Sequence, residues 1–235
     1  MVQTDSGEYC TQVDLNLYDS PEGDRLATQA AVGRHLQILT STPVNEAIEV
    51  RLCEDGYRAW LRKADLAHLT PAVEKYQPKA FSRLEIVDCL PTAIAFTKAA
   101  LQQPNYYLWG GTVAPNYDCS GLMQAAFAAS DIWLPRDSYQ QADFTERIPL
   151  AEILPGDLIF FAKASKVDHV ALYLGDGYYI HSSGVEMGRN GIGIDQLSEN
   201  GDEISRAYYR QLWGVGRVMN SYQLTVNSEQ LAVNS

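Results

Sequence analysis

The feature that most constrains this chain is a cysteine at the predicted start of a helix. Residues 122–129 are mostly strong helix formers, free of Gly, Pro and β-branched side chains. Asp118 stands where an N-cap residue should, able to accept from the first free backbone N–H groups. Cys119 then occupies the first helical position, where the helix dipole favours the thiolate and hence a nucleophile. The neighbouring Asp118 carboxylate opposes that charge, so we expect the thiolate to need a cationic partner.

Two histidines flank a predicted β-hairpin farther along the chain. Two runs rich in Val, Ile, Leu and Tyr lie on either side of Gly175-Asp176-Gly177, a turn signal. A two-residue loop would put His169 and His181 on opposite faces of the sheet. A three-residue loop would put them on one face as diagonal neighbours, roughly 7–8 Å apart at Cα. If both serve one site, the loop must therefore be odd in length.

A helix-start cysteine and two histidines on one sheet face form a nucleophile, a base and an orienting group. His169 would take the proton of Cys119 and return it to the leaving amine, while His181 would hold the His169 imidazole. Taken singly, Cys119 also fits a small buried apolar residue, and each histidine also fits a structural role. The chain has only 4 His, so the combination favours the catalytic interpretation.

Five segments that carry these residues resemble the NlpC-type cell-wall cysteine peptidases, which have a papain-like fold. In the family's order they are residues 107–111, 118–121, 154–158, 168–173 and 179–182. The resemblance covers roughly residues 84–218. It implies a Cys-His-His triad with Cys119, His169 and His181 at the matching positions. It also directs the Tyr107 hydroxyl at the nucleophile, where it could complete an oxyanion hole with the N–H at the helix start; Tyr107 also fits a core aromatic residue.

The N-terminal part of the chain reads as short strands separated by turns, a pattern that suggests a small barrel. The predicted strands lie within residues 9–18, 26–30, 35–39, 47–53 and 57–62. In one of them Ile48, Val50 and Leu52 share a face. This part resembles a bacterial SH3-like domain through residues 15–18, 20–21, 33 and 56–61.

We therefore predict an α+β protein in which a papain-like catalytic domain, with helices packed on an antiparallel sheet, follows a small SH3-like β-barrel. The predicted bounds are 1–70 for the SH3-like domain, 71–83 for a linker, 84–220 for the peptidase domain and 221–235 for a C-terminal tail. Within the peptidase domain we expect a helix over 84–101 that is interrupted near Pro91, and strands at 158–161 and 213–218.

Charge and leader signals bear on the partners and the location. The net charge of −11, without long single-sign blocks, argues against nucleic acid and anionic membrane surfaces as partners. The first eight residues show neither a basic n-region nor an apolar run, and no stretch approaches transmembrane length. We therefore expect a cytoplasmic protein.

Cysteine spacing bears on cofactors. The 4 Cys include no C-x-x-C pair, so no disulfide scaffold and no metal site or other cofactor is predicted. The sequence makes no prediction about the oligomeric state.

The resemblance implies hydrolysis of murein stem peptides, at the bond between the γ-carboxyl of D-glutamate and a diamino acid. In relatives with an N-terminal SH3-like domain, that domain can wall off the substrate cleft and select a free N-terminal L-Ala. Tyr57 and Asp65 are the candidates for holding its ammonium; alternatively Tyr57 packs the barrel and Asp65 is solvated. The absent leader signal favours released fragments, as in murein peptide recycling, over intact wall.

Further candidates for substrate binding lie near the nucleophile. Arg136 is the best cation for a substrate carboxylate, with Arg189 weaker, although a solvated surface arginine is the commoner outcome. Asp118, Ser120 and Ser138 complete the candidate set.

Two other classes of function stay open. One is another thiol acyl transferase or amidase, which a panel of amine acceptors would distinguish. The other is a non-catalytic cell-wall-binding protein, which would bind murein without turnover.

Overall fold

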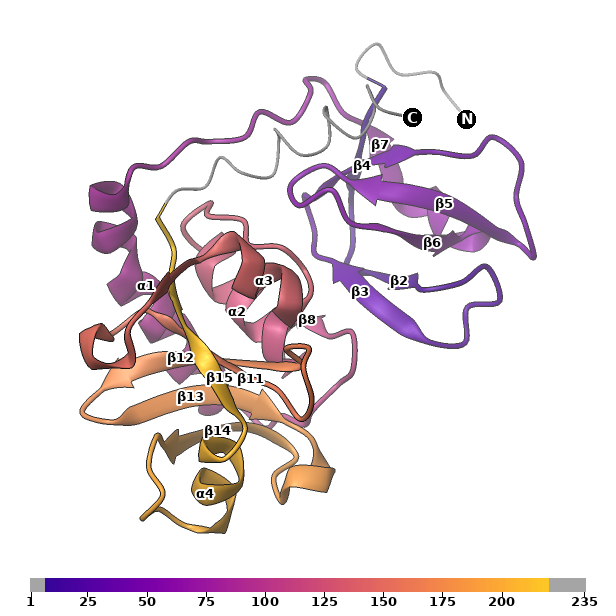
Figure 1. The fold of residues 1–235 in the computed structure, drawn as a ribbon. Helices are drawn as coiled ribbons and strands as arrows, with labels where there is room; N and C mark the ends of the chain where they lie inside the picture. The colour runs from indigo at the N-terminus through magenta and orange to yellow at the C-terminus, as the bar shows by residue number, and fades with distance from the viewer. Residues whose placement is uncertain (1–6, 220–235) are drawn as a thin grey trace. The chain divides into compact units, whose positions relative to one another are not determined.

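The structure is a computed structural model and describes residues 7–219 of the chain. These residues divide into two compact units, one reaching to Pro78 and including Trp109–Val113, the other formed by Lys79–Leu108 and the chain from Ala114 onward (Figure 1). The division after Pro78 falls inside the predicted linker 71–83. The predicted domain bounds stay a prediction, and the tail at 221–235 lies outside the described residues.

The first unit is built on a seven-stranded antiparallel sheet with the order β3-β2-β6-β5-β4-β1-β7. Its strands are β1 (Tyr9–Thr11), β2 (Leu15–Tyr18), β3 (Leu26–Ala30), β4 (His35–Ile38), β5 (Ala47–Leu52), β6 (Arg58–Arg62) and β7 (Leu69–Pro71). A 3-10 helix, η1 (Lys63–His68), precedes β7, and the short β8 (Thr112–Val113) also belongs to this unit. The short strands confirm the predicted SH3-like architecture.

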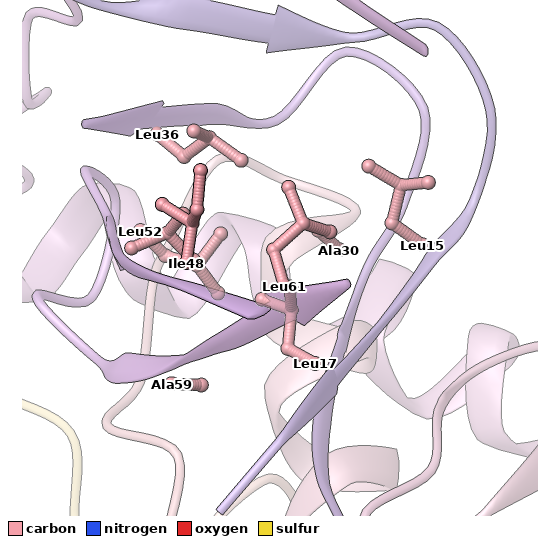
Figure 2. Packing of buried hydrophobic residues seen from close by; sticks show 9 residues of the cluster. Leu15, Leu17, Ala30, Leu36, Ile48, Leu52, Ala59 and Leu61 are labelled. Carbon is pink, nitrogen blue, oxygen red and sulfur yellow. The ribbon is translucent and has the colours of Figure 1, made fainter. Parts of the chain in front are cut away.

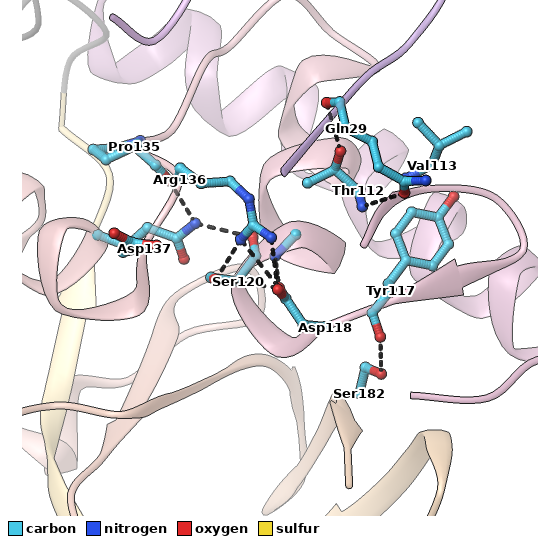
Figure 3. A network of polar contacts seen from close by, with 12 residues as sticks. Gln29, Thr112, Val113, Tyr117, Asp118, Ser120, Pro135, Arg136, Asp137 and Ser182 are labelled. Atoms are coloured by element: carbon cyan, nitrogen blue, oxygen red, sulfur yellow. Dashed lines mark hydrogen bonds and ion pairs between the residues drawn. The ribbon is translucent and has the colours of Figure 1, made fainter. Parts of the chain in front are cut away.

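Residues 109–113 group with the first unit although the family resemblance assigned residues 107–111 to the catalytic part. Gln29 on β3 carries this link (Figure 3). Its Oε1 accepts from the backbone N–H groups of Thr112 and Val113, at 3.1 and 3.2 Å, and its carbonyl accepts from the Thr112 hydroxyl at 2.9 Å.

Alternating side chains of these strands form the core of the first unit (Figure 2). Ile48, Val50 and Leu52 are each 1% exposed or less, which confirms that they share a buried face. Leu17 and Leu61 are completely buried in the same cluster. Period-2 alternation therefore determined which side chains of these strands point inward.

Leu61→Ala is expected to destabilise this unit by about 2–5 kcal/mol, because a completely buried side chain is replaced by a cavity. Val32→Ala, at a position that is 61% exposed, is the matched control and should change the free energy of unfolding by less than about 0.5 kcal/mol. Urea denaturation followed by circular dichroism measures both. Equal losses in the two variants would contradict this description of the core.

The second unit packs helices on a six-stranded antiparallel sheet with the order β10-β15-β11-β12-β13-β14. Its helices are α1 (Arg83–Leu101), α2 (Cys119–Ala128), α3 (Ser138–Phe144) and α4 (Glu203–Tyr209), with 3-10 turns η2 (Leu150–Glu152) and η3 (Val185–Met187). Its strands are β9 (Asn116–Tyr117), β10 (Glu146–Ile148), β11 (Leu158–Phe161), β12 (His169–Gly175), β13 (Tyr178–Ser183), β14 (Gly191–Gln196) and β15 (Leu212–Arg217). Helices on an antiparallel sheet confirm the predicted α+β class.

Helix α1 runs through Pro91 without a break, so the predicted interruption is wrong. Ser82 and Glu85 form a capping box that fixes its start. Pro91 has no N–H, so the helix lacks one backbone hydrogen bond there, and Pro91 itself is exposed. Burial of Ile86 and Leu90 on the opposite side stabilises the helix through this position.

The β12–β13 hairpin places His169 and His181 on one face of the sheet without the odd-length loop that the sequence analysis required. Its loop is the two-residue Asp176-Gly177, with both residues at positive φ (53° and 78°), as a type I′ turn requires. A β-bulge between Tyr173 and Gly175 supplies the extra residue, so that Tyr173 pairs with Tyr179. The bulge thus replaces the odd loop in placing both histidines on one face.

Strand β14 and helix α4 were not predicted. β14 pairs with β13 along its whole length, with Asp195 opposite Tyr179. Tyr208 of α4 belongs to the core cluster on the face that also carries Phe161 and Tyr179. Among residues 7–219, no helix has both the length and the apolar character needed to cross a bilayer.

Candidate active site

Helix α2 places Cys119 as the sequence predicts, at its first position. The Asp118 carboxylate caps the helix by accepting from the Gly121 N–H at 2.7 Å. Cys119 is 6% exposed, and its sulfur accepts from the backbone N–H of Val170, which also lowers the pKa of the thiol. The nucleophile candidate therefore lies beside the start of β12, one residue from His169.

The protonation state of Cys119 differs from the expectation. Burial, together with the negative charge of Asp118, raises the pKa of the thiol to about 12. The Val170 and Ser120 backbone N–H groups and the Arg136 charge lower this pKa, by less. Desolvation therefore outweighs these contacts, and the resting group is a neutral thiol.

Arg136 is the cation beside this thiol, but it faces inward (Figure 3). It is 2% exposed, its Nη1 and Nη2 donate to the two Asp118 oxygens at 3.2 and 2.6 Å, and Nη1 also donates to Ser120 Oγ at 3.0 Å. Gln141 Nε2 donates to the carbonyls of Ser120 and Pro135, at 3.0 and 2.8 Å, which ties this segment to α2. The alternative of a solvated surface arginine is wrong, because the guanidinium balances the Asp118 carboxylate inside the protein. Binding of a substrate carboxylate by Arg136 stays a prediction.

The two hairpin histidines meet directly. His169 Nε2 and His181 Nδ1 are 2.7 Å apart, and His181 Nε2 lies 2.7 Å from Asp195 Oδ2 on β14. His181 is completely buried and His169 is 9% exposed. Since Nε2 of His169 is used by His181, Nδ1 is the nitrogen left to serve Cys119.

Burial sets the charge of both imidazoles. The pKa of His169 is lowered well below 6.5, first by desolvation, and then by the neighbouring His181 imidazole and the charge of Lys163. The pKa of His181 is also lowered by desolvation, against the raising effect of Asp195. At neutral pH both rings are therefore neutral, and His169 is able to accept a proton.

Two tyrosines surround the thiol and the imidazoles. Tyr208 stacks on the His169 ring at 4.7 Å between centroids, and its hydroxyl is 2.6 Å from Ser183 Oγ. Tyr107 lies near Cys119: burial raises the pKa of its phenol, and the negative charge of Asp118 also raises this pKa. The Tyr107 phenol therefore stays protonated and is able to donate a hydrogen bond.

The other substrate-binding candidates lie in different surroundings. Ser138 is buried at the first position of α3. In the first unit Tyr57 is half-buried against the core, and Asp65 is half-buried in the first turn of η1. Arg189 pairs with Asp195, so the expectation that it binds a substrate carboxylate is not supported by its contacts.

The cysteines supply free thiols to the second unit and to the first. All four cysteines are free thiols. Within residues 7–219, no group of three or more His, Cys, Asp and Glu side chains is arranged to hold a metal ion. A thiol beside a neutral imidazole whose far nitrogen is fixed by a second imidazole can perform nucleophilic acyl transfer.

Sequence reasoning missed Asp195, Tyr208 and the inward role of Arg136. A signal for Asp195 was present, because residues 191–196 alternate Gly and Ile before an acid, directly after the strand that carries His181. For Tyr208 no local pattern pointed to a histidine as its partner.

Comparison with known proteins matches both units. Residues 104–213 match the model of the NlpC/P60 family, and residues 17–66 match that of the bacterial dipeptidyl-peptidase Sh3 domain. A gamma-D-glutamyl-L-lysine dipeptidyl-peptidase of Bacillus cereus is 31% identical over 173 residues, which cover 72% of this chain and 47% of the relative. A probable endopeptidase p60 of Listeria welshimeri is 38% identical over 112 residues, which cover 48% of this chain and 19% of the relative. The chain thus spans less than half the length of these curated relatives.

A solved structure agrees with the fold. The crystal structure of an NlpC/P60 family protein from Bacillus cereus superposes with a TM-score of 0.50 at 26% identity, covering 90% of this chain and 63% of that one.

Proposed function

Because this chain carries an NlpC/P60 domain together with a bacterial SH3 domain, we propose that it is a cysteine peptidase of bacterial cell-wall peptides. The proposed bond joins the γ-carboxyl of D-glutamate to a diamino acid. The observation that carries the proposal is the 2.7 Å contact between His169 and His181, beside a thiol hydrogen-bonded to the next residue, Val170.

The proposed reaction proceeds through a thioester. Cys119 Sγ attacks the γ-carbonyl carbon while its proton passes to His169 Nδ1. The developing oxyanion receives hydrogen bonds from the Tyr107 hydroxyl and the N–H at the start of α2. Collapse breaks the C–N bond, and His169 returns the proton to the leaving amine. Water then attacks the thioester and gives a proton to His169. The C–S bond breaks, His169 returns that proton to the Cys119 sulfur, and the product releases its remaining proton to water and leaves as the γ-carboxylate.

The finer specificity is proposed from the relatives. The printed name of the Bacillus cereus relative specifies a γ-D-glutamyl-L-lysine bond and dipeptidyl release. We carry both over. We further propose, from the family resemblance of the sequence, that the substrate has a free N-terminal L-Ala and that Tyr57 and Asp65 of the first unit hold its ammonium. A conserving substitution, Asp65→Asn, should then raise KM for the free peptide without changing kcat.

A panel of synthetic peptides tests the function. L-Ala-γ-D-Glu-L-Lys, its meso-diaminopimelate counterpart, the N-acetylated forms and an α-linked Glu isomer are incubated with the full chain, and products are read by mass spectrometry. Release of L-Ala-D-Glu from the free γ-linked peptides alone is expected. Cleavage of the α-linked isomer, or transfer to added amines in excess of hydrolysis, would contradict the proposal.

Released fragments rather than intact wall are the proposed substrates, and the cytoplasm is the proposed location. Turnover of tripeptide with no release from purified murein sacculi is the expected result. Fractionation of cells from the source organism tests the location directly.

The pH dependence follows from the two buried groups. Because the pKa of His169 lies well below 6.5, kcat/KM should stay flat down to pH 6.5 and fall only below it, as His169 becomes protonated. Because the pKa of Cys119 is about 12, no rise should appear near pH 8–9, where an ordinary thiol ionises. A profile of kcat/KM against pH at constant ionic strength measures both its acid and its alkaline parts. A fall in kcat/KM centred above pH 6.5 would contradict a neutral His169 beside a neutral Cys119 thiol.

A further inference from the structure

We propose that Asp195 is a positioning residue that sets the tautomers of both histidines, and that Arg189 holds it in the orientation required. This inference rests on the proposed function, in which His169 is the base. It adds a carboxylate to the predicted set of one cysteine and two histidines. Through the series of hydrogen bonds from Asp195 to His181 to His169, this carboxylate determines which nitrogen of His169 accepts a proton.

The contacts form one continuous series inside the second unit. Asp195 Oδ2 lies 2.7 Å from His181 Nε2, and His181 Nδ1 lies 2.7 Å from His169 Nε2. The Asp195 side chain is 1% exposed and His181 is completely buried. With the series shielded from water, each member has only its neighbour as a hydrogen-bond partner along this line.

The donor and acceptor roles follow from the end of the series. A carboxylate only accepts, so His181 carries its proton on Nε2 and presents an unprotonated Nδ1. His169 must then donate from Nε2, which leaves its Nδ1 unprotonated. That is the nitrogen available to Cys119, so the carboxylate makes His169 a base towards the thiol.

The charged and titratable groups around Asp195 come from three elements. β13 contributes His181 and Tyr179, which is opposite Asp195 in the sheet. α4 contributes Tyr208, whose pKa is raised in part by the Asp195 charge. The loop before β14 contributes Arg189, whose Nη2 donates to Asp195 Oδ1. Asp202, at the start of α4, acts on Tyr179 together with Asp195.

Arg189 determines which way the side-chain amide points in the variant Asp195→Asn. Arginine only donates, so the amide oxygen of the substituted side chain must stay on Arg189 and its amide nitrogen must face His181. The amide N–H then donates to His181 Nε2, which moves the His181 proton to Nδ1 and the His169 proton to Nδ1. His169 Nδ1, the nitrogen available to Cys119, is then already protonated and cannot act as a base.

Long-range ¹H–¹⁵N correlation spectra of ¹⁵N-histidine-labelled protein report the tautomers directly. In the wild-type chain near neutral pH, both histidines should be protonated on Nε2; protonation of His169 on Nδ1 would overturn the proposal. In Asp195→Asn both should change to the Nδ1–H form; unchanged tautomers would also overturn it. The wild-type spectrum decides the question even if the variant does not fold.

Kinetics on L-Ala-γ-D-Glu-L-Lys give the second readout. Asp195→Asn should lower kcat by up to about 10⁴-fold, the loss seen when a triad carboxylate is replaced by its amide, with KM changed less than about threefold. Asp168→Asn removes an exposed carboxylate next to His169 and should leave kcat unchanged. A large rise in KM without a fall in kcat would contradict a role through the base.

The two readouts separate this inference from the proposed function. If no peptide in the panel is cleaved, the proposed function fails, while the tautomers of the wild-type chain still test the role of Asp195.

Discussion

Cys119→Ala is expected to lower kcat/KM for L-Ala-γ-D-Glu-L-Lys by at least about 10⁴-fold, because every step of the proposed reaction passes through its sulfur. Removal of a nucleophile in a hydrolase with a comparable set of groups costs about 10⁶-fold in kcat. The residual rate would come from the oxyanion donors alone. Initial rates measured by chromatography of released L-Ala-D-Glu give the comparison.

Two controls make this result specific. Cys89→Ala removes a half-buried thiol on α1 of the same unit and should leave kcat/KM unchanged. Thermal unfolding of Cys119→Ala should resemble that of the wild-type chain, since a thiol replaced by a methyl group keeps the helix cap of Asp118. Activity retained by Cys119→Ala would refute thiol catalysis.

Arg136→Met is expected to destabilise the second unit by about 3–5 kcal/mol, because it leaves the buried Asp118 carboxylate without its guanidinium. The side chains of this ion pair are 2% and 9% exposed, so water does not replace the lost contact. The charge of Arg136 lowers the pKa of Cys119, so its removal should raise that pKa further and lower kcat/KM. Chemical denaturation and the peptide assay measure the two effects.

A double-mutant cycle is the control for this prediction. Asp118→Asn combined with Arg136→Met removes both charges and should recover most of the stability lost in the single variant. Arg217→Met breaks a pair with Asp157 in which the arginine is 18% exposed, against 2% for Arg136, and should cost less than Arg136→Met. Equal losses in the single and double variants would contradict the importance of the charge balance beside the thiol.

Local sequence rules predicted the elements that carry the nucleophile and the base. The helix formers after Cys119 and the Asp118 cap predicted α2, and β-branched and aromatic runs around two glycines predicted the β12–β13 hairpin. The parity argument gave the correct requirement, one face for His169 and His181. The bulge between Tyr173 and Gly175 met it instead of an odd loop, because loop length and bulge formation are equivalent ways to shift a register.

The predictions that failed concern charge and interior packing. Arg136 shows no local sign of burial, and only its approach to Asp118 and Ser120 makes it internal. The helix dipole argument favours a Cys119 thiolate, but it considers one helix only, and burial in the second unit is the largest contribution to the pKa of the thiol.

By itself, the sequence determined which residue types carry the chemistry and which short elements hold them, since capping, turn formation and strand alternation depend on neighbours along the chain. Only the tertiary structure decided that Asp195 stands behind His181, that Arg136 balances Asp118, and that the thiol and both imidazoles rest uncharged. These properties arise where segments far apart in the chain exclude water together, and desolvation and pairing energies depend on that shared environment.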